Sequence, residues 1–175
     1  MKILTILIML SAFTFLGCVP RENARGGDTA ETDVQTPDQA GTAEASNYAE
    51  GSWITDYSQA LASAANLNRH VLINFTGSDW CSWCFKLRDE VFTQPAFIDY
   101  AKANFVLLTV DFPRRTKLPA SQQKANQALA ESFGVQGFPT IVLVDSQGKE
   151  ITRTGYQYGG AENYVKHLKE LLGEN

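Results

Sequence analysis

Apolar and polar positions divide the chain into three parts. A predominantly apolar run from Ile3 to Leu16 comes first, and a polar stretch from Val19 to Glu50 follows it. From Gly51 onward, apolar residues recur at the spacings typical of buried strands and amphipathic helices. The pattern therefore predicts one folded domain over residues 51–175, preceded by two segments that do not belong to its fold.

The domain is expected to contain alternating helices and strands. Short apolar, β-branched runs predict strands at residues 71–75, 105–110, 140–144 and 150–154, the last two joined as a hairpin through residues 145–149. Helical spacing predicts a first helix that is capped by Asp56 or Ser58 and runs through Asn66. Further helices are expected from about Cys81 to Ala101 and over residues 121–133 and 161–172. Pro95 is expected to interrupt the second helix, and Thr93 to cap its continuation. This order predicts a three-layer α/β/α sandwich around a mixed sheet of four to five strands.

The first segment resembles a secretion signal. Lys2 gives a positive start, and the apolar run is too short to span a bilayer but has the length of a signal-peptide core. Phe15-Leu16-Gly17-Cys18 is similar to the lipobox of bacterial lipoproteins, in which cleavage precedes a lipidated cysteine. The similarity implies a signal peptide at residues 1–17, a lipid on Cys18, and an extracytoplasmic place in the bacterial cell envelope, facing the periplasm in a Gram-negative cell. The alternative is ordinary secretion with a free or buried Cys18.

The second segment, residues 18–50, is acidic and poor in large apolar residues. It carries seven acidic residues against Arg21 and Arg25, and it cannot bury enough apolar surface to offset the entropy of ordering. We expect it to be a disordered tether between the lipid and the domain. From Gly51 onward the chain has twelve basic and twelve acidic residues, so the domain is balanced in charge. This balance gives no indication of a nucleic-acid partner.

Cys81 and Cys84 belong to the most informative motif, Trp80-Cys81-Ser82-Trp83-Cys84. It follows an apolar strand and begins a helix, whose unpaired amides and partial positive charge favour a thiolate at Cys81. Cys84 is expected one turn further on the same face, close enough to form a disulfide and less exposed. Half of a zinc site and an inert structural disulfide are the alternatives. No second Cys-x-x-Cys and no close histidine pair completes a zinc site, so no metal is expected. A disulfide that closes so short a loop would stabilise little.

These features resemble the thioredoxin superfamily over roughly Trp53 to Leu172. Besides Trp80-Cys81-x-x-Cys84, the resemblance includes Val135-Gln136-Gly137-Phe138-Pro139-Thr140, similar to the family's cis-proline segment, and Gly155, in the place of a glycine that borders the substrate groove. Phe92-Thr93-Gln94-Pro95 with Asn104-Phe105-Val106 is closest to the extracytoplasmic thioredoxin-like proteins of bacteria. The resemblance implies a cis Phe138–Pro139 bond, with Pro139 positioning an extended substrate peptide near Cys81.

The chain departs from the family pattern beneath the cysteine pair. The family's redox proteins often bury an aspartate there, which helps deprotonate the second cysteine. The matching strand offers Asn74 or Phe75, and a lysine often found on the next strand matches Leu107. None of these is a base, so water or Asp79 is the expected substitute.

Other candidate residues have two interpretations each. Trp80, Trp83 and Phe138 are expected to border the substrate groove, the alternative being a place in the core. His70 and His167 are interpreted as structural or solvated residues rather than ligands. Arg114, Arg115 and Lys117 are interpreted as part of a solvated loop, the alternative being a docking patch for an acidic partner. Tyr156 and Tyr158 are interpreted as residues that pack within their loop.

The sequence therefore predicts a membrane-tethered, monomeric, extracytoplasmic thiol-disulfide oxidoreductase. Cys81 would attack a protein or peptide disulfide and Cys84 would resolve the mixed disulfide, with no cofactor beyond the disulfide itself. A separate redox partner would recharge the pair. The small domain favours a reductase over an oxidase or isomerase. The alternative from another class is a peptide-binding or metallochaperone module that uses the groove or the thiols without turnover.

Overall fold

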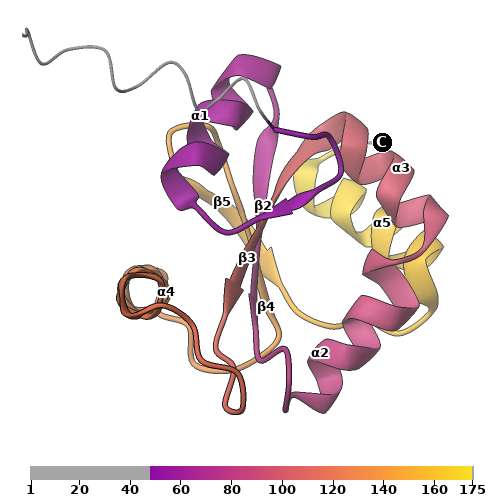
Figure 1. Ribbon diagram of the computed structural model, residues 1–175. Coiled ribbons are helices and arrows are strands. Elements are labelled where there is room, and N and C mark those ends of the chain that lie inside the picture. The colour runs from indigo at the N-terminus through magenta and orange to yellow at the C-terminus, as the bar shows by residue number, and fades with distance from the viewer. Residues whose placement is uncertain (1–47, 175) are drawn as a thin grey trace, which may run out of the picture. The chain divides into compact units, whose positions relative to one another are not determined.

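The structure, a computed structural model, describes residues 48–174 (Figure 1). The strands are β1 (Trp53–Ile54), β2 (His70–Thr76), β3 (Phe105–Asp111), β4 (Thr140–Val144) and β5 (Glu150–Thr154). The helices are α1 (Tyr57–Leu67), α2 (Ser82–Leu87), α3 (Pro95–Asn104), α4 (Ala120–Ser132) and α5 (Gly160–Leu172), with a π-helical segment η2 (Arg88–Phe92) directly after α2. The predicted signal peptide, Cys18 and the tether up to residue 47 lie outside the described residues.

The sheet is mixed, as predicted, with the strand order β1-β3-β2-β4-β5. β1, β3 and β2 are parallel, whereas β4 runs antiparallel to β2 and β5 antiparallel to β4. The fifth strand is β1, a two-residue edge strand in which Trp53 pairs with Leu107. The carboxyl end of the central strand β2 therefore lies between two neighbours, and the segment that follows it carries the cysteine motif.

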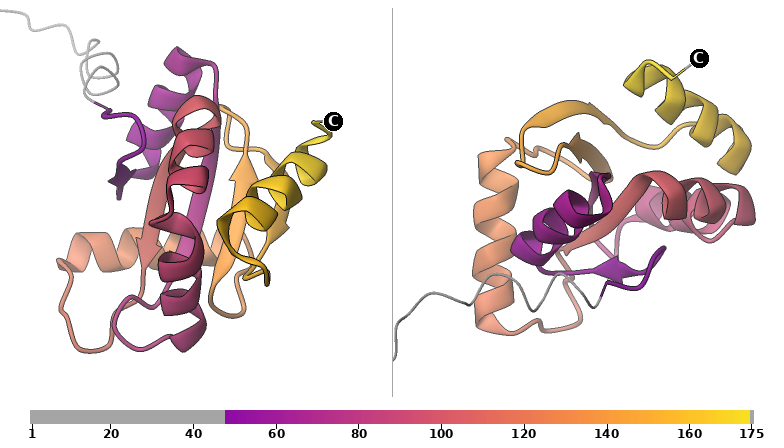
Figure 2. Two further views of the ribbon diagram at one scale, coloured as in Figure 1. Left: turned by 90° about the vertical axis from the view of Figure 1, so that its right-hand side faces the viewer. Right: turned by 90° about the horizontal axis from the view of Figure 1, so that it is seen from above.

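Apolar side chains cover both faces of the sheet. Leu72, Leu107 and Leu143 belong to one buried cluster, which α2, η2, α3 and α5 complete, while Ile73 and Phe75 belong to a second cluster with α1 and α4. Figure 2 shows these two sets of helices on opposite faces of the sheet. Burial on both faces explains why β2 and β3 are nearly continuous apolar runs rather than alternating ones. The three-layer α/β/α sandwich is confirmed.

The helix ends confirm one predicted cap and correct another. Asp56 caps α1, because its carboxylate accepts a hydrogen bond from the Gln59 amide at 2.8 Å. Thr93 does not cap α3. Its hydroxyl donates to the carbonyl oxygens of Arg88 and Asp89, 3.1 and 3.2 Å away, and so closes the end of η2. The residue before α3 is Gln94, which makes no capping bond with its side chain. The predicted long helix is therefore three segments in sequence.

The folded part begins before Gly51, which corrects the predicted boundary. The Tyr48 hydroxyl accepts a hydrogen bond from the Leu107 amide at 3.1 Å, and Glu50 forms an ion pair with Arg69 at 3.1 Å. The sequence places Tyr48 in the tether because one tyrosine in a polar stretch gives no periodic signal. Across residues 48–174, no helix is both long enough and apolar enough to cross a lipid bilayer.

Candidate active site

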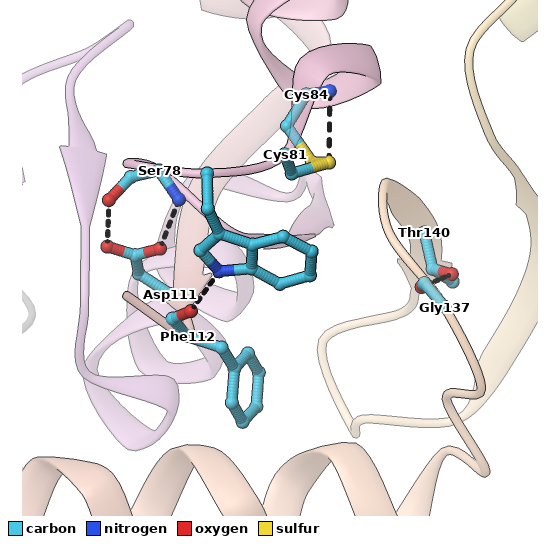
Figure 3. The surroundings of a disulfide bond; sticks show 8 residues. Ser78, Cys81, Cys84, Asp111, Phe112, Gly137 and Thr140 are labelled. Atoms are coloured by element: carbon cyan, nitrogen blue, oxygen red, sulfur yellow. Dashed lines mark hydrogen bonds between the residues drawn. A yellow bond between two sulfur atoms is a disulfide. The ribbon is translucent and has the colours of Figure 1, made fainter. Parts of the chain in front are cut away.

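Cys81 and Cys84 form a disulfide at the start of α2, with their Cα atoms 5.2 Å apart. Cys81 is the N-cap residue of the helix, and its Sγ accepts a hydrogen bond from the Cys84 amide at 3.2 Å (Figure 3). The turn before it is closed by the Cys81 amide, which donates to the Gly77 carbonyl at 3.0 Å. A thiolate at Cys81 would thus keep a backbone donor and the positive end of the helix beside it.

The two cysteines are equally covered, contrary to the prediction that Cys84 is the less exposed one. Each exposes 6% of its surface in the disulfide-bonded form. The cysteines differ in what surrounds them. The Cys81 sulfur accepts the helix amide, while Cys84 lines a cavity under the helix.

That cavity, of about 390 Å³, places Asn74 beneath the pair. Its lining includes Cys84, Asn74 and Arg88, and it also includes Thr76 and Thr109. Phe75 is fully buried in the cluster on the opposite face of the sheet, so Asn74 is the one of these two residues that lies beneath the cysteine pair. Its Oδ1 atom is buried and has no hydrogen-bond partner among the described residues. None of the described residues that line this cavity carries a carboxylate.

Asp79 lies elsewhere, which corrects its interpretation as the substitute base. Its carboxylate accepts hydrogen bonds from the amides of Arg114, Arg115 and Thr116, at 2.9, 2.8 and 3.0 Å. These bonds, led by the one from Arg114, hold the pKa of the Asp79 carboxyl below its usual value. Asp79 is therefore an anchor for the loop after β3 and does not line the cavity under Cys84.

Trp80 packs on the side of Cys81, against residues from two other segments. Its indole Nε1 donates to the Phe112 carbonyl at 2.8 Å, and its ring lies edge-on to Phe138, with centroids 5.9 Å apart. Phe112 and Phe138 stack at 5.1 Å. The structure thus brings Trp80 and Phe138 into contact and adds Phe112, which local sequence patterns do not single out.

Gly77 makes room for that indole, and we predict that Gly77→Ala displaces it. A Cβ atom at Gly77 would lie 2.5 Å from Trp80 Cε2, which forces the ring to shift. Overpacking of this kind costs about 1–3 kcal/mol, so the urea midpoint should fall and the tryptophan fluorescence should change. Gly137→Ala is the matched control, because nothing lies within 4 Å of an added Cβ there. Equal stability of the two variants would contradict the packing described.

The proline segment lies opposite the cysteines. The Phe138–Pro139 bond is cis, in agreement with the prediction. Gly155 lies against it, since a Cβ at Gly155 would approach the Pro139 carbonyl oxygen to 3.3 Å. The Thr140 hydroxyl donates to the Gly137 carbonyl at 2.7 Å, and Figure 3 shows this short turn facing the disulfide.

Trp83 lies on the other side of the pair, in a cluster that sequence reasoning missed. Its ring is 5.3 Å from Tyr156 and 6.3 Å from Tyr158, and the two tyrosines are 5.2 Å apart. Trp83 is 44% exposed and Tyr158 71%. The Tyr156 hydroxyl donates to Glu90, which raises the pKa of Tyr156 to about 12. The available signal is the pair of tyrosines in Tyr156-Gln157-Tyr158, just before Gly159-Gly160, but a loop sequence does not indicate that these side chains reach Trp83.

The histidines agree with their structural interpretation. His70 starts β2 and pairs in register with Phe105, and the Nε2 atom of His167 lies 2.8 Å from the Thr154 hydroxyl. Among residues 48–174 there is no group of three or more His, Cys, Asp or Glu side chains that could hold a metal ion.

The protein is a thiol-disulfide oxidoreductase of thioredoxin fold. Its Cys-x-x-Cys disulfide lies at the start of a helix, a cis-proline turn faces this disulfide, and both belong to a domain built on a mixed five-stranded sheet. Comparison with known families agrees. The family described as thioredoxin-like domain matches residues 57–172, and the chain belongs to this family.

Three individual matches show what the chain is similar to. Disulfide bond reductase DsbH of Chlamydia pneumoniae is 35% identical over 116 residues, which cover 66% of this chain and 70% of that protein. A solved structure of a DsbH oxidoreductase superposes with a TM-score of 0.68 at 31% identity, covering 84% of this chain and 96% of that one. Thioredoxin-related protein DsbJ of the same organism is 31% identical over 59% of this chain, but the match spans only 30% of DsbJ.

Proposed function

We propose that this protein reduces disulfides of proteins or peptides outside the cytoplasm, with Cys81 as the attacking and Cys84 as the resolving cysteine. The observation that carries the assignment is the contact between Cys81 Sγ and the Cys84 amide at the start of α2. It gives Cys81, and not Cys84, a donor that favours a thiolate. The reductive direction is supported by the name of the relative from Chlamydia pneumoniae, a disulfide bond reductase.

The proposed turnover has two exchange steps. The Cys81 thiolate attacks one sulfur of the substrate disulfide, a mixed disulfide forms, and the other substrate sulfur leaves as a thiolate that takes up a proton. Cys84 then loses its proton and attacks Cys81 Sγ. The second substrate thiol leaves and the Cys81–Cys84 disulfide is restored. Two electrons and two protons pass to the substrate, and a dithiol partner must return them before the next turnover.

Substrate binding and the loss of the Cys84 proton depend on groups around the cysteine pair. An extended substrate would lie against Pro139, with Trp80 and Phe138 on one side and Trp83 on the other. This is supported by the ring contact between Trp80 and Phe138 and by the exposure of Trp83. The proton of Cys84 would leave through the cavity beneath it, where Asn74 and the threonine hydroxyls can hold water but cannot act as a base.

The direction of electron flow is tested by the reduction potential of the pair. Equilibration with glutathione buffers should give a value near −270 mV, which is typical of a reductant, whereas about −120 mV would mark an oxidant and contradict the proposal. None of the described residues in the cavity beneath Cys84 is an acid, which favours a second candidate, a module that binds peptides without turnover. A pair with a reducing potential but no disulfide-reductase activity would support that candidate.

We propose in addition that residues 1–17 are removed as a signal peptide and that Cys18 carries a lipid. Support comes from the lipobox-like sequence and from the polar segment that follows it. In a bacterial host given radiolabelled palmitate, the wild-type protein should carry label and sediment with membranes, while Cys18→Ser should be unlabelled. Labelling of Cys18→Ser, or no labelling of the wild type, would contradict the anchor.

A further inference from the structure

The loop between β3 and α4 is bound tightly to the segment that carries the cysteines. We call residues 113–117, which contain Arg114, Arg115 and Lys117, the basic loop. Asp79 accepts three consecutive amides of this loop. At the end of β3, Asp111 accepts hydrogen bonds from the Ser78 amide at 2.9 Å and the Ser78 hydroxyl at 2.5 Å (Figure 3). The basic loop is therefore held in a fixed place beside the disulfide.

Arg114 connects this loop to the active site. Its guanidinium carbon lies 3.6 Å from the centre of the Trp80 ring. Trp80 is the residue directly before Cys81. A cation over an indole face is favourable, and stacking leaves the edge of the guanidinium, with its N–H donors, free for a planar anion. Arg114 is exposed and belongs to none of the ion pairs found in residues 48–174.

Arg114 also lines a groove of about 710 Å³ with two further cations. Lys117 of the basic loop and Lys124 of α4 lie along it, together with polar side chains such as Gln123 and Gln127. The acid in the lining, Asp111, is already engaged by Ser78. Like Arg114, the two lysines are exposed and take part in no ion pair of the described residues. The groove thus presents three positive side chains against one carboxylate of its lining, Asp111, which already accepts two hydrogen bonds from Ser78.

We propose that this groove binds an acidic segment of the protein that exchanges its disulfide with Cys81. The inference rests on the proposed function and specifies in addition that the partner is negatively charged next to its reacting cysteine. Carboxylates next to the reacting cysteine of the partner would pair with Arg114 first, because Arg114 contacts Trp80, the residue directly before Cys81, and then with Lys117 and Lys124. The position beside Trp80 places the acidic segment on the Cys81 side of the pair.

Three synthetic peptides test this proposal. Each has one internal disulfide, and they differ only in whether two positions beside one cysteine hold Glu, Gln or Lys. At low ionic strength, kcat/KM of the wild-type protein should be about fivefold higher for the Glu peptide than for the Gln peptide, and lower for the Lys peptide. The preference should weaken as salt is added, because the groove is exposed.

Two triple variants provide the comparison. In Arg114→Gln/Lys117→Gln/Lys124→Gln the ratio of Glu to Gln peptide should fall to about one. The matched control Lys149→Gln/Lys166→Gln/Lys169→Gln removes the same charge from the β4–β5 turn and from α5, and should keep the wild-type ratio. If the ratio of kcat/KM for the Glu peptide to that for the Gln peptide were one in the wild type, or equal in both triple variants, the proposed binding of acidic segments in the groove would be overturned. Turnover of the Gln peptide would still support the proposed function in that case.

Binding measurements separate the proposal of an acidic-segment groove from the proposed reductase function. The Glu peptide with serine in place of both cysteines should bind the wild type and the control, and bind the groove variant at least severalfold more weakly. This result would support the groove even if no peptide were reduced, an outcome that would count against the proposed function alone. Displacement of the peptide by inorganic phosphate at equal charge concentration would indicate a site for small anions and overturn the proposal.

Discussion

Replacing Cys81 with serine is expected to lower kcat/KM for a peptide disulfide by roughly three orders of magnitude or more. The thiolate is the nucleophile in thiol-disulfide exchange, and a serine hydroxyl at the same helix start does not form a sulfur–sulfur bond. The Cys84 amide would still have an acceptor in the serine hydroxyl, so α2 should remain intact. The rate of peptide reduction, followed with an external dithiol in excess, is the measurement.

Cys84→Ser is the comparison for that experiment. It removes the resolving thiol but leaves the attacking one, so the first exchange should still occur once per molecule. Because Cys81 and Cys84 are equally covered in the disulfide form, exposure does not decide which one attacks. If Cys84→Ser lost the first exchange and Cys81→Ser retained it, the two roles would be reversed.

Tyr164→Ala is expected to lower the free energy of unfolding by about 3–5 kcal/mol, the range for removing a buried aromatic ring. Tyr164 of α5 is fully buried, and its ring lies 6.2 Å from Phe92 and 6.4 Å from Phe97. Its hydroxyl donates to the Gly155 carbonyl at 3.2 Å, so α5 is joined through this residue to the segment beside Pro139. The total free energy of unfolding of a native protein is typically only about 5–15 kcal/mol, so this loss would be a large part of it.

Tyr164→Phe is the control, because it keeps the ring and removes only the hydrogen bond. It should cost about 1 kcal/mol. Urea unfolding of both variants, followed by circular dichroism, gives the comparison. A loss in Tyr164→Ala no larger than in Tyr164→Phe would show that the ring does not contribute to the core as described.

Much of the fold could be predicted because its signals are strong and local. The apolar runs of β2 and β3 and the hairpin of β4 and β5 predict four strands with ends within one residue of those observed. The strand β1 could not be found in this way, since two residues are too few to show a period. Thr93 was misassigned because a threonine before Pro95 has the sequence of a helix start, whereas its hydroxyl closes the preceding π-helical segment.

The site was predictable in its chemistry and less so in its surroundings. The motif identified the cysteine pair and the proline turn, but the choice between Asn74 and Phe75 depends on which face of β2 each occupies. Alternation along the strand decides it: Asn74 faces α2 with Leu72, and Phe75 faces the other layer with Ile73. The contacts of Tyr156 with Trp83 and of Arg114 with Trp80 join distant segments, which local patterns do not reveal.

The central claim is that Cys81 attacks and Cys84 resolves, and trapping the mixed disulfide tests it most directly. Reduced Cys84→Ser protein is mixed with a disulfide peptide, quenched with acid and analysed by mass spectrometry after digestion without reductant. The account predicts one peptide bound through sulfur to Cys81, and no adduct with Cys81→Ser under the same conditions. An adduct at Cys84 of the Cys81→Ser protein, together with none at Cys81 of the Cys84→Ser protein, would contradict it.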